Sequence, residues 1–405
     1  MKILHVIPSY EPAWIFGGTV TATSQLCRAL ARKGVDVTVY TTDADGKGGH
    51  LYLPINRPIE VGGVKVWYFN CDFGVKKAFF SRHLSNKLKE TITYFDLVHV
   101  SSIWQWMQQT VYYICKRKKI PYIVTPHSSL QKSSFYAVGP HLTKKLYWKY
   151  FGQRTIKAAS GIHLLCKGER DESEIFLNFT PSFIVPNGID INKYKYSENK
   201  KIQLRKSMKI SNKAMVLLFL GRIHPIKQIE LVIRSLPYIF QNRKEYFLII
   251  AGPVEDKSYF KFLKKISNKL QLNENIIWKG PIDNTEVSSF YSASDILILP
   301  SKSEGISMTI IEAMASSLPV LISNRVANYY EVDIDKAGIV VQPYFESVRE
   351  ALIKIFTKPY LLKEMSQNAR ISTVKRYRIE KVASLMIKAY EDILYGRRSP
   401  DLQWK

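Results

Sequence analysis

The sequence predicts an α/β protein built from two parallel, doubly wound sheets. Short apolar segments rich in β-branched residues alternate with longer segments of helical spacing along the whole chain. Several short segments are unbroken apolar runs, which is typical of strands covered by helices on both faces. The chain has 405 residues, 46% of them hydrophobic, which suffices for two domains of ordinary size.

The predicted strands form two sets. Those of the first half are 3–7, 35–41, 64–69, 97–101, 122–125, 162–165 and 183–185. Those of the second half are 215–220, 247–251, 276–278, 296–299, 320–322 and 339–341. The segments 19–33 and 229–240 have helical spacing.

The boundary between the two halves is predicted at Pro186-Asn187-Gly188, because proline and Asn-Gly interrupt both helices and strands. Residues 192–213 are polar and rich in lysine, as a connection would be. We therefore expect a first domain over 1–186, a second over 187–378, and a final segment, 379–405, with a helix near 380–395.

Glycines and cations follow the predicted strands, at the edge where open α/β sheets bind ligands. Gly17 and Gly18 precede a helix, where glycine lets backbone N–H groups approach a phosphate, although a Gly-Gly pair is often only a turn. Arg222 and Lys227 follow the first strand of the second half. A guanidinium and an ammonium can hold a diphosphate, although two surface cations would give the same pattern.

The most specific pattern is the segment 303–315, after predicted strand 296–299. Glu304 is expected in the strand-to-helix loop, and Glu312 about two turns into the helix. Gly305 lets the backbone bend toward a ligand. The N–H groups that follow are expected to face an anion; they belong to Ile306, Ser307 and Met308. The two carboxylates can accept sugar and ribose hydroxyls; a glycosidase-like acid/base pair, or a surface glutamate at 312, are the alternatives.

Histidines are the remaining candidates. His127 follows predicted strand 122–125, where its ring can hydrogen-bond to a hydroxyl or a phosphate. A lone histidine is more often structural, so that interpretation stays open. His99 and His163 lie inside predicted strands and are assigned to packing.

The chain is strongly basic, with a formal net charge of +25. Residues 97–168 include eleven Lys or Arg and no Asp or Glu. This acid-free stretch should attract a polyanion such as lipid headgroups, a phosphorylated lipid carrier or nucleic acid, unless it is only a solvated, lysine-rich surface. Aromatic and leucine side chains accompany the cations; they include Trp104, Trp106, Tyr112, Tyr113, Leu142, Leu146, Trp148 and Tyr150. The pattern fits an anionic membrane surface, and core packing explains it as well.

Cellular location is predicted from cysteine spacing and from the lack of a secretory or membrane-spanning pattern in the sequence. The four cysteines lie far apart, as in a reducing compartment. The sequence starts directly in a strand pattern, and no apolar run reaches the roughly 20 residues needed to cross a bilayer. We expect a cytoplasmic protein, with or without attachment to the inner face of the membrane.

Together these motifs resemble glycosyltransferase family 4, whose members are retaining enzymes of the GT-B fold. The resemblance covers nearly the whole chain: Gly17-Gly18, Thr125-Pro126-His127, the 185–190 segment, Gly221-Arg222 with Lys227, and Glu304 to Glu312. It implies two Rossmann-like domains facing an interdomain cleft, with the final helix crossing back onto the first domain. The sequence departs from the family at Gln228, where glycine is frequent, and at Ser316-Ser317.

The resemblance also implies roles. Arg222 and Lys227 would hold the donor diphosphate, Glu304 the donor sugar and Glu312 the ribose. Gly17 and Gly18 would line the cleft near the phosphates, and His127 would sit at the sugar.

The implied reaction moves a sugar from a UDP- or GDP-sugar to a hydroxyl of a glycan or lipid-linked glycan, in cell-envelope polysaccharide or glycolipid synthesis. It needs no cofactor and no bound metal, because the two cations do the metal's work. A protein that binds a polyanion without transferase activity is the alternative, although no nucleic-acid motif is present and no nucleic-acid partner is expected. An epimerase or a phosphorylase is a further option within this fold.

Overall fold

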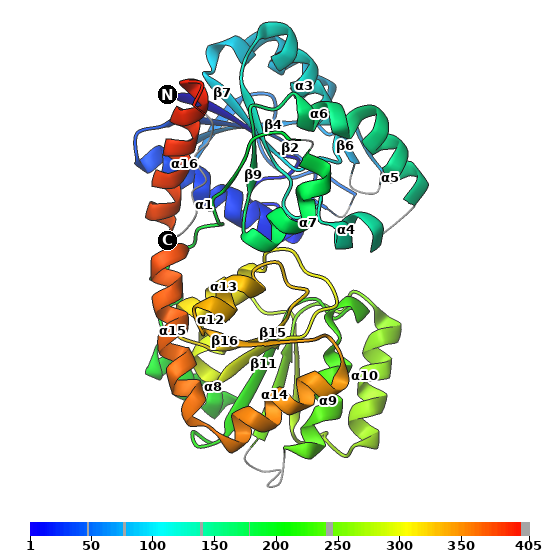
Figure 1. The fold of residues 1–405 in the computed structure, drawn as a ribbon, viewed down its shortest axis with the longest axis vertical. Helices are drawn as coiled ribbons and strands as arrows, with labels where there is room; N and C mark the ends of the chain where they lie inside the picture. The colour runs from blue at the N-terminus through cyan, green and yellow to red at the C-terminus, as the bar shows by residue number, and fades with distance from the viewer. Residues whose placement is uncertain (47, 76–77, 138–140, 178, 240–245, 398–405) are drawn as a thin grey trace. The chain divides into compact units, whose positions relative to one another are not determined.

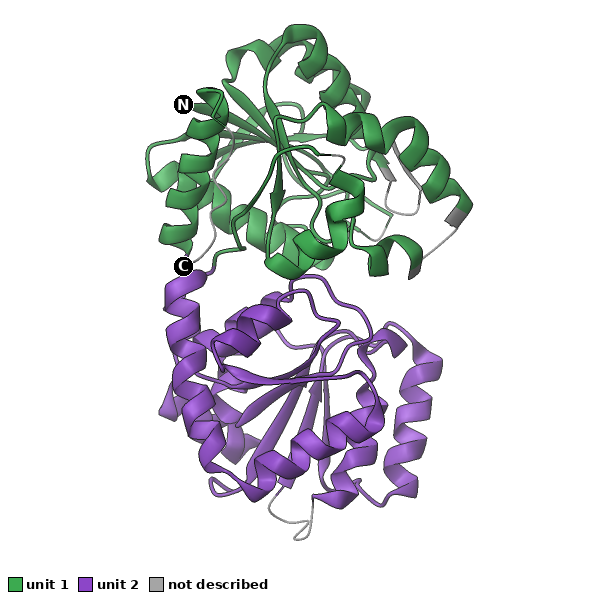
Figure 2. Cartoon of the chain, viewed as in Figure 1, with its two compact units in different colours: residues 1–188, 379–405 green, residues 189–378 purple. Residues whose placement is uncertain are grey.

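The computed structural model describes residues 1–397 except 47, 76–77, 138–140, 178 and 240–245. The chain forms two compact units, shown in Figure 2. Unit 1 comprises Met1–Gly188 and Ile379–Lys405, and unit 2 comprises Ile189–Arg378. The chain therefore leaves unit 1, builds unit 2 as one continuous segment, and returns to unit 1.

Unit 1 contains an eight-stranded sheet in the order β10-β9-β8-β7-β1-β2-β4-β3 (Figure 1). Its strands are β1 (Lys2–Val6), β2 (Asp36–Thr42), β3 (Pro58–Val61), β4 (Val64–Phe69), β7 (Leu97–Ser101), β8 (Tyr122–Thr125), β9 (Gly161–Leu164) and β10 (Ser182–Ile184). All neighbouring pairs are parallel except β3 and β4. A separate hairpin joins β5 (Phe73–Val75) to β6 (Ala78–Phe80).

One edge strand of this sheet, β3, is antiparallel to its neighbour and was not among the predicted strands. Gly62 and Gly63 connect β3 to β4, and both have positive φ, 62° and 80°. A type I′ hairpin turn has this conformation at both central positions, and glycine adopts it without strain. Alternate residues of β3 are exposed, so this strand lacks the apolar run that marks the others.

Helices cover both faces of the sheet in unit 1. One apolar cluster joins the sheet to α1 (Gly18–Arg32) and α16 (Ile379–Leu394), which pack against each other (Figure 1). The other cluster joins the opposite face to α2 (Arg82–Thr91), α3 (Trp106–Lys118), α6 (Gln153–Lys157) and α7 (Lys167–Leu177). The remaining helical segments are η1 (Trp14–Phe16), η2 (Ile92–Tyr94), α4 (Lys132–Ala137), α5 (His141–Tyr147) and η3 (Trp148–Gly152).

Buried histidines link the strands of unit 1. His99 bonds to the Tyr390 hydroxyl of α16 at 2.7 Å and to the Thr125 hydroxyl at 2.6 Å. Thr125 in turn bonds to His163 at 2.8 Å, and His163 bonds to the Val185 carbonyl at 2.7 Å. Burial lowers the pKa of His163 to about 4 and that of His99 well below its usual range, so both rings are neutral near pH 7.

Unit 2 contains a six-stranded, fully parallel sheet in the order β13-β12-β11-β14-β15-β16. Its strands are β11 (Met215–Leu220), β12 (Tyr246–Ala251), β13 (Ile276–Gly280), β14 (Ile296–Leu299), β15 (Val320–Ser323) and β16 (Gly338–Val341). Its helices are α8 (Glu198–Ser207), η4 (Pro225–Lys227), α9 (Ile229–Ser235), η5 (Leu236–Tyr238), α10 (Lys257–Lys269), α11 (Val287–Ala293), α12 (Met308–Ala315), α13 (Tyr329–Ile334), α14 (Phe345–Thr357) and α15 (Tyr360–Arg376).

Helix α9 is shorter than the predicted segment 229–240. It ends at Ser235, and a 3₁₀ turn follows over Leu236–Tyr238. Pro237 lacks the N–H that would continue the α-helical ladder, which accounts for the change. The last predicted position, residue 240, lies outside the described residues.

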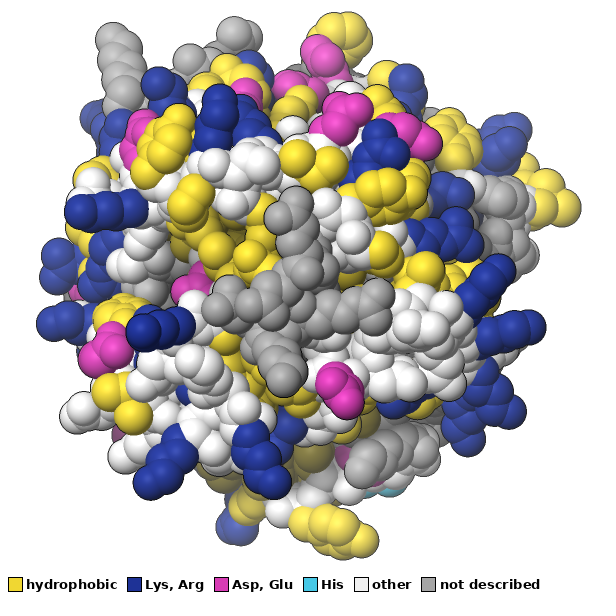
Figure 3. All heavy atoms as spheres, turned by 90° about the horizontal axis from the view of Figure 1, so that it is seen from below, with side chains coloured by type: hydrophobic (Ala, Val, Ile, Leu, Met, Phe, Trp, Pro, Cys, Tyr) yellow, Lys and Arg dark blue, Asp and Glu magenta, His cyan; other side chains and the backbone are white. Residues whose placement is uncertain are grey.

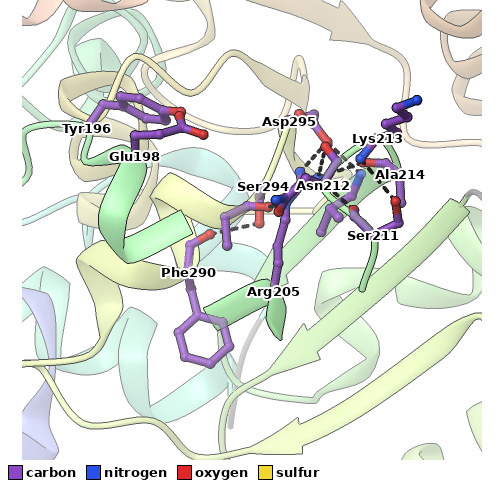
Figure 4. Close-up of polar contacts among 12 residues, drawn as sticks. Tyr196, Glu198, Arg205, Ser211, Asn212, Lys213, Ala214, Phe290, Ser294 and Asp295 are labelled. Atoms are coloured by element: carbon purple, nitrogen blue, oxygen red, sulfur yellow. Dashed lines mark hydrogen bonds and ion pairs between the residues drawn. The ribbon is translucent and has the colours of Figure 1, made fainter. Parts of the chain in front are cut away.

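Arg205 of α8 fastens the start of unit 2 to its sheet (Figure 4). Its buried guanidinium donates to the Ala293 carbonyl at 2.8 Å and to Asp295 Oδ2 at 2.9 Å. The same side chain donates to three carbonyls of the connection before β11, those of Ser211, Asn212 and Ala214. Asp295 Oδ2 also accepts the Val216 N–H at 2.7 Å, so one ion pair holds β11 beside β14.

Candidate active site

Two cations follow β11 in unit 2. Arg222 is exposed, and its Nη1 donates to Glu255 Oε2 at 2.5 Å. Lys227 is buried, and its ammonium forms an ion pair with Glu304. The structure therefore joins two residues predicted separately from the sequence, and it pairs Arg222 with Glu255, which sequence patterns did not indicate.

A tight turn directs Lys227 inward. Pro225 starts the 3₁₀ helix η4, and His224 Nδ1 accepts the Ile226 N–H at 3.2 Å. Gln228 then ends the turn with a left-handed φ of 50°. Its side-chain amide donates to the Pro343 carbonyl at 3.3 Å, which helps to hold a conformation that glycine would adopt more easily.

The loop that carries Glu304 is held on two sides. Glu304 N–H donates to the Arg325 carbonyl at 3.0 Å, and the Ala327 N–H donates to the Glu304 carbonyl at 3.0 Å. These bonds pair the loop after β14 with the loop after β15. Lys302 N–H donates to the Ile226 carbonyl at 2.8 Å, which ties the same loop to the turn of Lys227. Backbone hydrogen bonds therefore hold the two loops so that the side chains of Lys227 and Glu304 meet.

Glu312 lies nearer the start of its helix than the sequence predicted. Ser307 has an extended backbone, so α12 begins only at Met308 and Glu312 is its fifth residue, little more than one turn in. Its carboxylate accepts the hydroxyls of Tyr194 at 3.0 Å and Tyr291 at 2.9 Å. Burial raises the pKa of Glu312, and the two hydroxyl donors partly oppose that shift.

The start of α12 provides backbone donors beside these carboxylates. Gly305 and Ile306 are half-buried in the loop, and Ser307 is the N-cap without a side-chain capping bond. The first N–H groups of a helix have no intrahelical partner, and the helix dipole favours an anion there. The segment from Gly305 to Met308 can therefore bind a negatively charged group.

Gly17, Gly18 and His127 belong to unit 1. Gly17 has φ 78° between η1 and α1, and Gly18 is the first residue of α1. An added Cβ at Gly17 would meet no atom within 4 Å, so the backbone angle rather than space requires glycine. His127 follows β8 with φ 49°.

The His127 ring is suited to hydrogen bonding in its neutral form. Burial, together with nearby His163, lowers the pKa of His127 to about 3. Within the described part of the chain, its Nε2 has no hydrogen-bond partner. A neutral imidazole with a free nitrogen can donate to or accept from a hydroxyl, depending on its tautomer.

The arrangement in unit 2 combines buried and exposed cations, two carboxylates and a helix start at the carboxyl ends of parallel strands. Among the described residues, no group of three or more His, Cys, Asp and Glu is arranged to hold a metal ion. None of the helices described is both long and apolar enough to span a bilayer.

Two doubly wound units, with these groups after strands of unit 2, define a glycosyltransferase of the GT-B fold. Residues 200–372 match the model of glycosyl transferases group 1, and residues 16–193 match that of Glycosyltransferase Family 4. The chain belongs to glycosyltransferase family 4 and is a glycosyltransferase.

Known proteins resemble the chain over most of its length. Alpha-monoglucosyldiacylglycerol synthase of Acholeplasma laidlawii is 26% identical over 313 residues, which cover 74% of this chain and 76% of that protein. Sucrose-phosphate synthase of Thermosynechococcus elongatus has a TM-score of 0.75 at 17% identity, with 98% and 100% of the chains covered. Anabaena HepE in complex with UDP has a TM-score of 0.74 at 15% identity, with 97% and 100% covered. The two structural similarities confirm the fold.

Proposed function

We propose that this glycosyltransferase moves a sugar, with retention of configuration, from a UDP- or GDP-sugar to a hydroxyl of a glycan or lipid-linked glycan. Its product would belong to cell-envelope polysaccharide or glycolipid synthesis. The contact between Lys227 and Glu304 carries the proposal, because it sets a buried cation for a phosphate beside a carboxylate for a sugar hydroxyl. The UDP bound to HepE and the lipid product named for the Acholeplasma enzyme support this donor and this acceptor class.

Arg222 and Lys227 are proposed to neutralise the donor diphosphate. Both cations are paired with carboxylates, Arg222 with exposed Glu255 and Lys227 with Glu304. An exposed pair contributes only about 0–1 kcal/mol, so a diphosphate can displace Glu255 at little cost. The N–H groups from Gly305 to Met308 would add hydrogen bonds to the phosphates. Gly17 and Gly18 of unit 1 are proposed as further donor-binding residues.

Glu312 is proposed to accept the ribose hydroxyls of the donor. The hydroxyls of Tyr194 and Tyr291 occupy one lone pair on each carboxylate oxygen and hold the group in one orientation. The remaining lone pairs can accept further hydroxyl donors. His127, neutral near pH 7, is proposed to bond to a hydroxyl of the donor sugar.

The chemical step follows from these roles and from analogy with the family. The bond between the anomeric carbon and the phosphate oxygen breaks, and the acceptor oxygen bonds to that carbon on the same face. The acceptor proton passes to a phosphate oxygen of the leaving nucleoside diphosphate. Arg222 and Lys227 stabilise the negative charge that develops there.

A titration panel tests the donor site. UDP, GDP, ADP and their sugars are titrated calorimetrically into the wild type, Glu312→Gln and Glu346→Gln, a control in the exposed first turn of α14. One nucleotide class should bind, and Glu312→Gln should weaken it at least tenfold, since a hydrogen bond to a charged group contributes about 1.5–3 kcal/mol. No binding of any nucleotide would reject the donor proposal and favour the polyanion alternative.

We also propose that unit 1 attaches to the cytoplasmic face of an anionic membrane. Of the apolar side chains in the acid-free stretch, Trp148 packs in the core, whereas Leu142, Leu146 and Tyr150 are 70%, 46% and 50% exposed. The last three recur at intervals of four along α5 and η3, so they form one stripe, and Lys145 and Lys149 are exposed beside it.

The acid-free stretch differs in charge from the face that Figure 3 draws. On the face drawn in Figure 3, Lys and Arg side chains lie mainly around the margin, with Asp and Glu among them. Between residues 97 and 168 no acid interrupts the cations. Apolar groups beside uncompensated lysines suit the interface of an anionic bilayer.

Vesicle flotation tests the membrane proposal. Leu146→Ser with Lys145→Glu should lower binding to phosphatidylglycerol vesicles at least tenfold, because each cation near such a surface contributes about 1 kcal/mol. Phe262→Ser with Lys261→Glu makes the matched change on α10 of unit 2, where Phe262 is 42% exposed, and should leave binding unchanged. Equal losses in both variants, or no binding by the wild type, would contradict the proposal.

A further inference from the structure

The loop after β8 has an uncommon backbone. His127 and Ser128 have φ of 49° and 62°, so two successive residues with side chains occupy the left-handed region. This region disfavours residues with a Cβ, because that atom approaches the following carbonyl oxygen. Such a conformation persists only where surrounding contacts hold it.

Glu169 supplies contacts of this kind. It lies in the first turn of α7 and is fully buried. Its Oε1 accepts the Ser128 N–H at 2.5 Å, and its Oε2 accepts the Leu165 N–H at 2.8 Å. One carboxylate therefore ties the left-handed residues to the chain just after β9. Glu169 is also the first acidic residue after the acid-free stretch.

Glu172, nearly one turn further along α7, holds a different segment. Its Oε2 accepts the Ser133 N–H at 3.2 Å and the Ser133 hydroxyl at 2.7 Å. Ser133 belongs to α4, beyond the two left-handed residues. The two glutamates thus share a helix and a kind of contact, but only Glu169 bonds to the backbone next to His127.

We propose that Glu169 is the positioning residue for His127. By accepting the Ser128 N–H, it keeps both left-handed residues in place and fixes the direction of the unpartnered Nε2 of His127. Glu169 acts through Ser128 and touches no substrate. The catalytic consequence rests on the proposed function, in which His127 bonds to the donor sugar, whereas the structural link does not.

Four variants separate the structural link between Glu169 and His127 from its consequence for catalysis. Glu169→Gln replaces one acceptor oxygen by an NH₂ group, which cannot accept a backbone N–H. Ser128→Gly removes the Cβ at one of the two left-handed positions, so the backbone at residue 128 no longer needs the tether from Glu169. The double variant combines both changes. Glu172→Gln is the matched control on the same helix, and circular dichroism checks that each variant folds.

Two readouts are compared. The side-chain resonances of ¹⁵N-labelled His127 report its position without any ligand. The release of UDP from UDP-glucose, with water as acceptor, reports turnover. Glu169→Gln should shift the His127 resonances and lower kcat at least tenfold, with KM changed less than about twofold, because the diphosphate and ribose contacts lie in unit 2. The double variant should restore both readouts, and Glu172→Gln should change neither.

The outcomes discriminate between the two proposals. His127 resonances that stay unchanged in Glu169→Gln, or that Ser128→Gly fails to restore, would overturn the positioning role. Resonances that shift and recover, in a protein whose wild type binds and turns over no nucleotide sugar, would overturn the proposed function and leave the positioning role standing.

Discussion

Glu169 in unit 1 and Asp295 in unit 2 hold neighbouring backbone in different electrostatic settings. Asp295 Oδ2 accepts the Val216 N–H and also the guanidinium of Arg205. Glu169 accepts two backbone N–H groups and, within the described residues, pairs with no cation. Burial therefore raises the pKa of Glu169 to about 7, and the backbone donors oppose the shift only in part.

The difference shows two ways of anchoring a loop. At Asp295 an ion pair with Arg205 and a backbone hydrogen bond together hold β11 beside β14. A buried carboxylate without a cation takes up a proton near neutrality and then keeps only one full acceptor oxygen. The loop of His127 should therefore respond to pH.

The largest effect is expected at the ion pair of Asp295 and Arg205. Arg205→Leu removes the buried guanidinium that donates to four carbonyls and to Asp295, and it leaves the carbonyls of buried Ala214 and Ala293 without that donor. Breaking such a buried pair costs about 3–5 kcal/mol. Urea denaturation should show this loss, and Lys206→Leu, an exposed neighbour on α8, should change the free energy of unfolding by less than about 0.5 kcal/mol.

Glu169, which has no cation beside it among the described residues, should affect how the free energy of unfolding depends on pH. Between its ordinary value of 4.5 and about 7, Glu169 binds a proton in the folded state but not in the unfolded state. The free energy of unfolding should therefore fall as the pH rises through this window, by up to about 3 kcal/mol from this group. The variant Glu169→Gln has no titrating carboxyl at this position, so it lacks this pH-dependent contribution to the free energy of unfolding.

Urea titrations of the wild type and Glu169→Gln at about pH 5 and pH 8 measure the difference directly, since contributions from other groups cancel. The wild type should lose stability relative to the variant at the higher pH. A difference that is constant with pH, or that changes with the opposite sign, would contradict the unpaired state of Glu169.

The smallest effect is expected at the exposed pair of Arg222 and Glu255. Glu255→Gln should change the free energy of unfolding by less than about 0.5 kcal/mol, because solvent screens both charges. The same change should tighten nucleoside diphosphate binding, since Arg222 no longer has to leave a carboxylate. Weaker binding in a calorimetric titration would show that Glu255 supports the site rather than competing with the ligand.

The sequence predicted the buried strands well. β4, β7, β8, β11 and β14 have the predicted bounds, because each is an apolar run between polar or turn residues. The short strands β3, β5 and β6 were missed. β3 is an exposed edge strand paired through a hairpin, so neither an apolar run nor a parallel crossover marks it.

The candidate site was predictable only where its residues follow strands. Lys227 and Glu304 stand out in the sequence because each follows an apolar run within a few residues, although their contact appears only in the structure. Tyr194 lies 118 residues from the glutamate that it binds, and no local pattern connects the two. Glu169 was missed for the same reason, since its importance comes from the Ser128 backbone 41 residues earlier.

The order of the two units along the chain affects how the protein folds while it is being synthesised. Unit 2 is one continuous segment, whereas unit 1 needs α16, which follows unit 2 in the sequence. On the ribosome, unit 2 can fold while unit 1 still lacks Val382, Met386 and Tyr390 from its core. Until α16 emerges, the nascent protein exposes an apolar side of α1 and leaves His99 Nδ1 without its Tyr390 partner. This is the interval in which a chaperone would be needed.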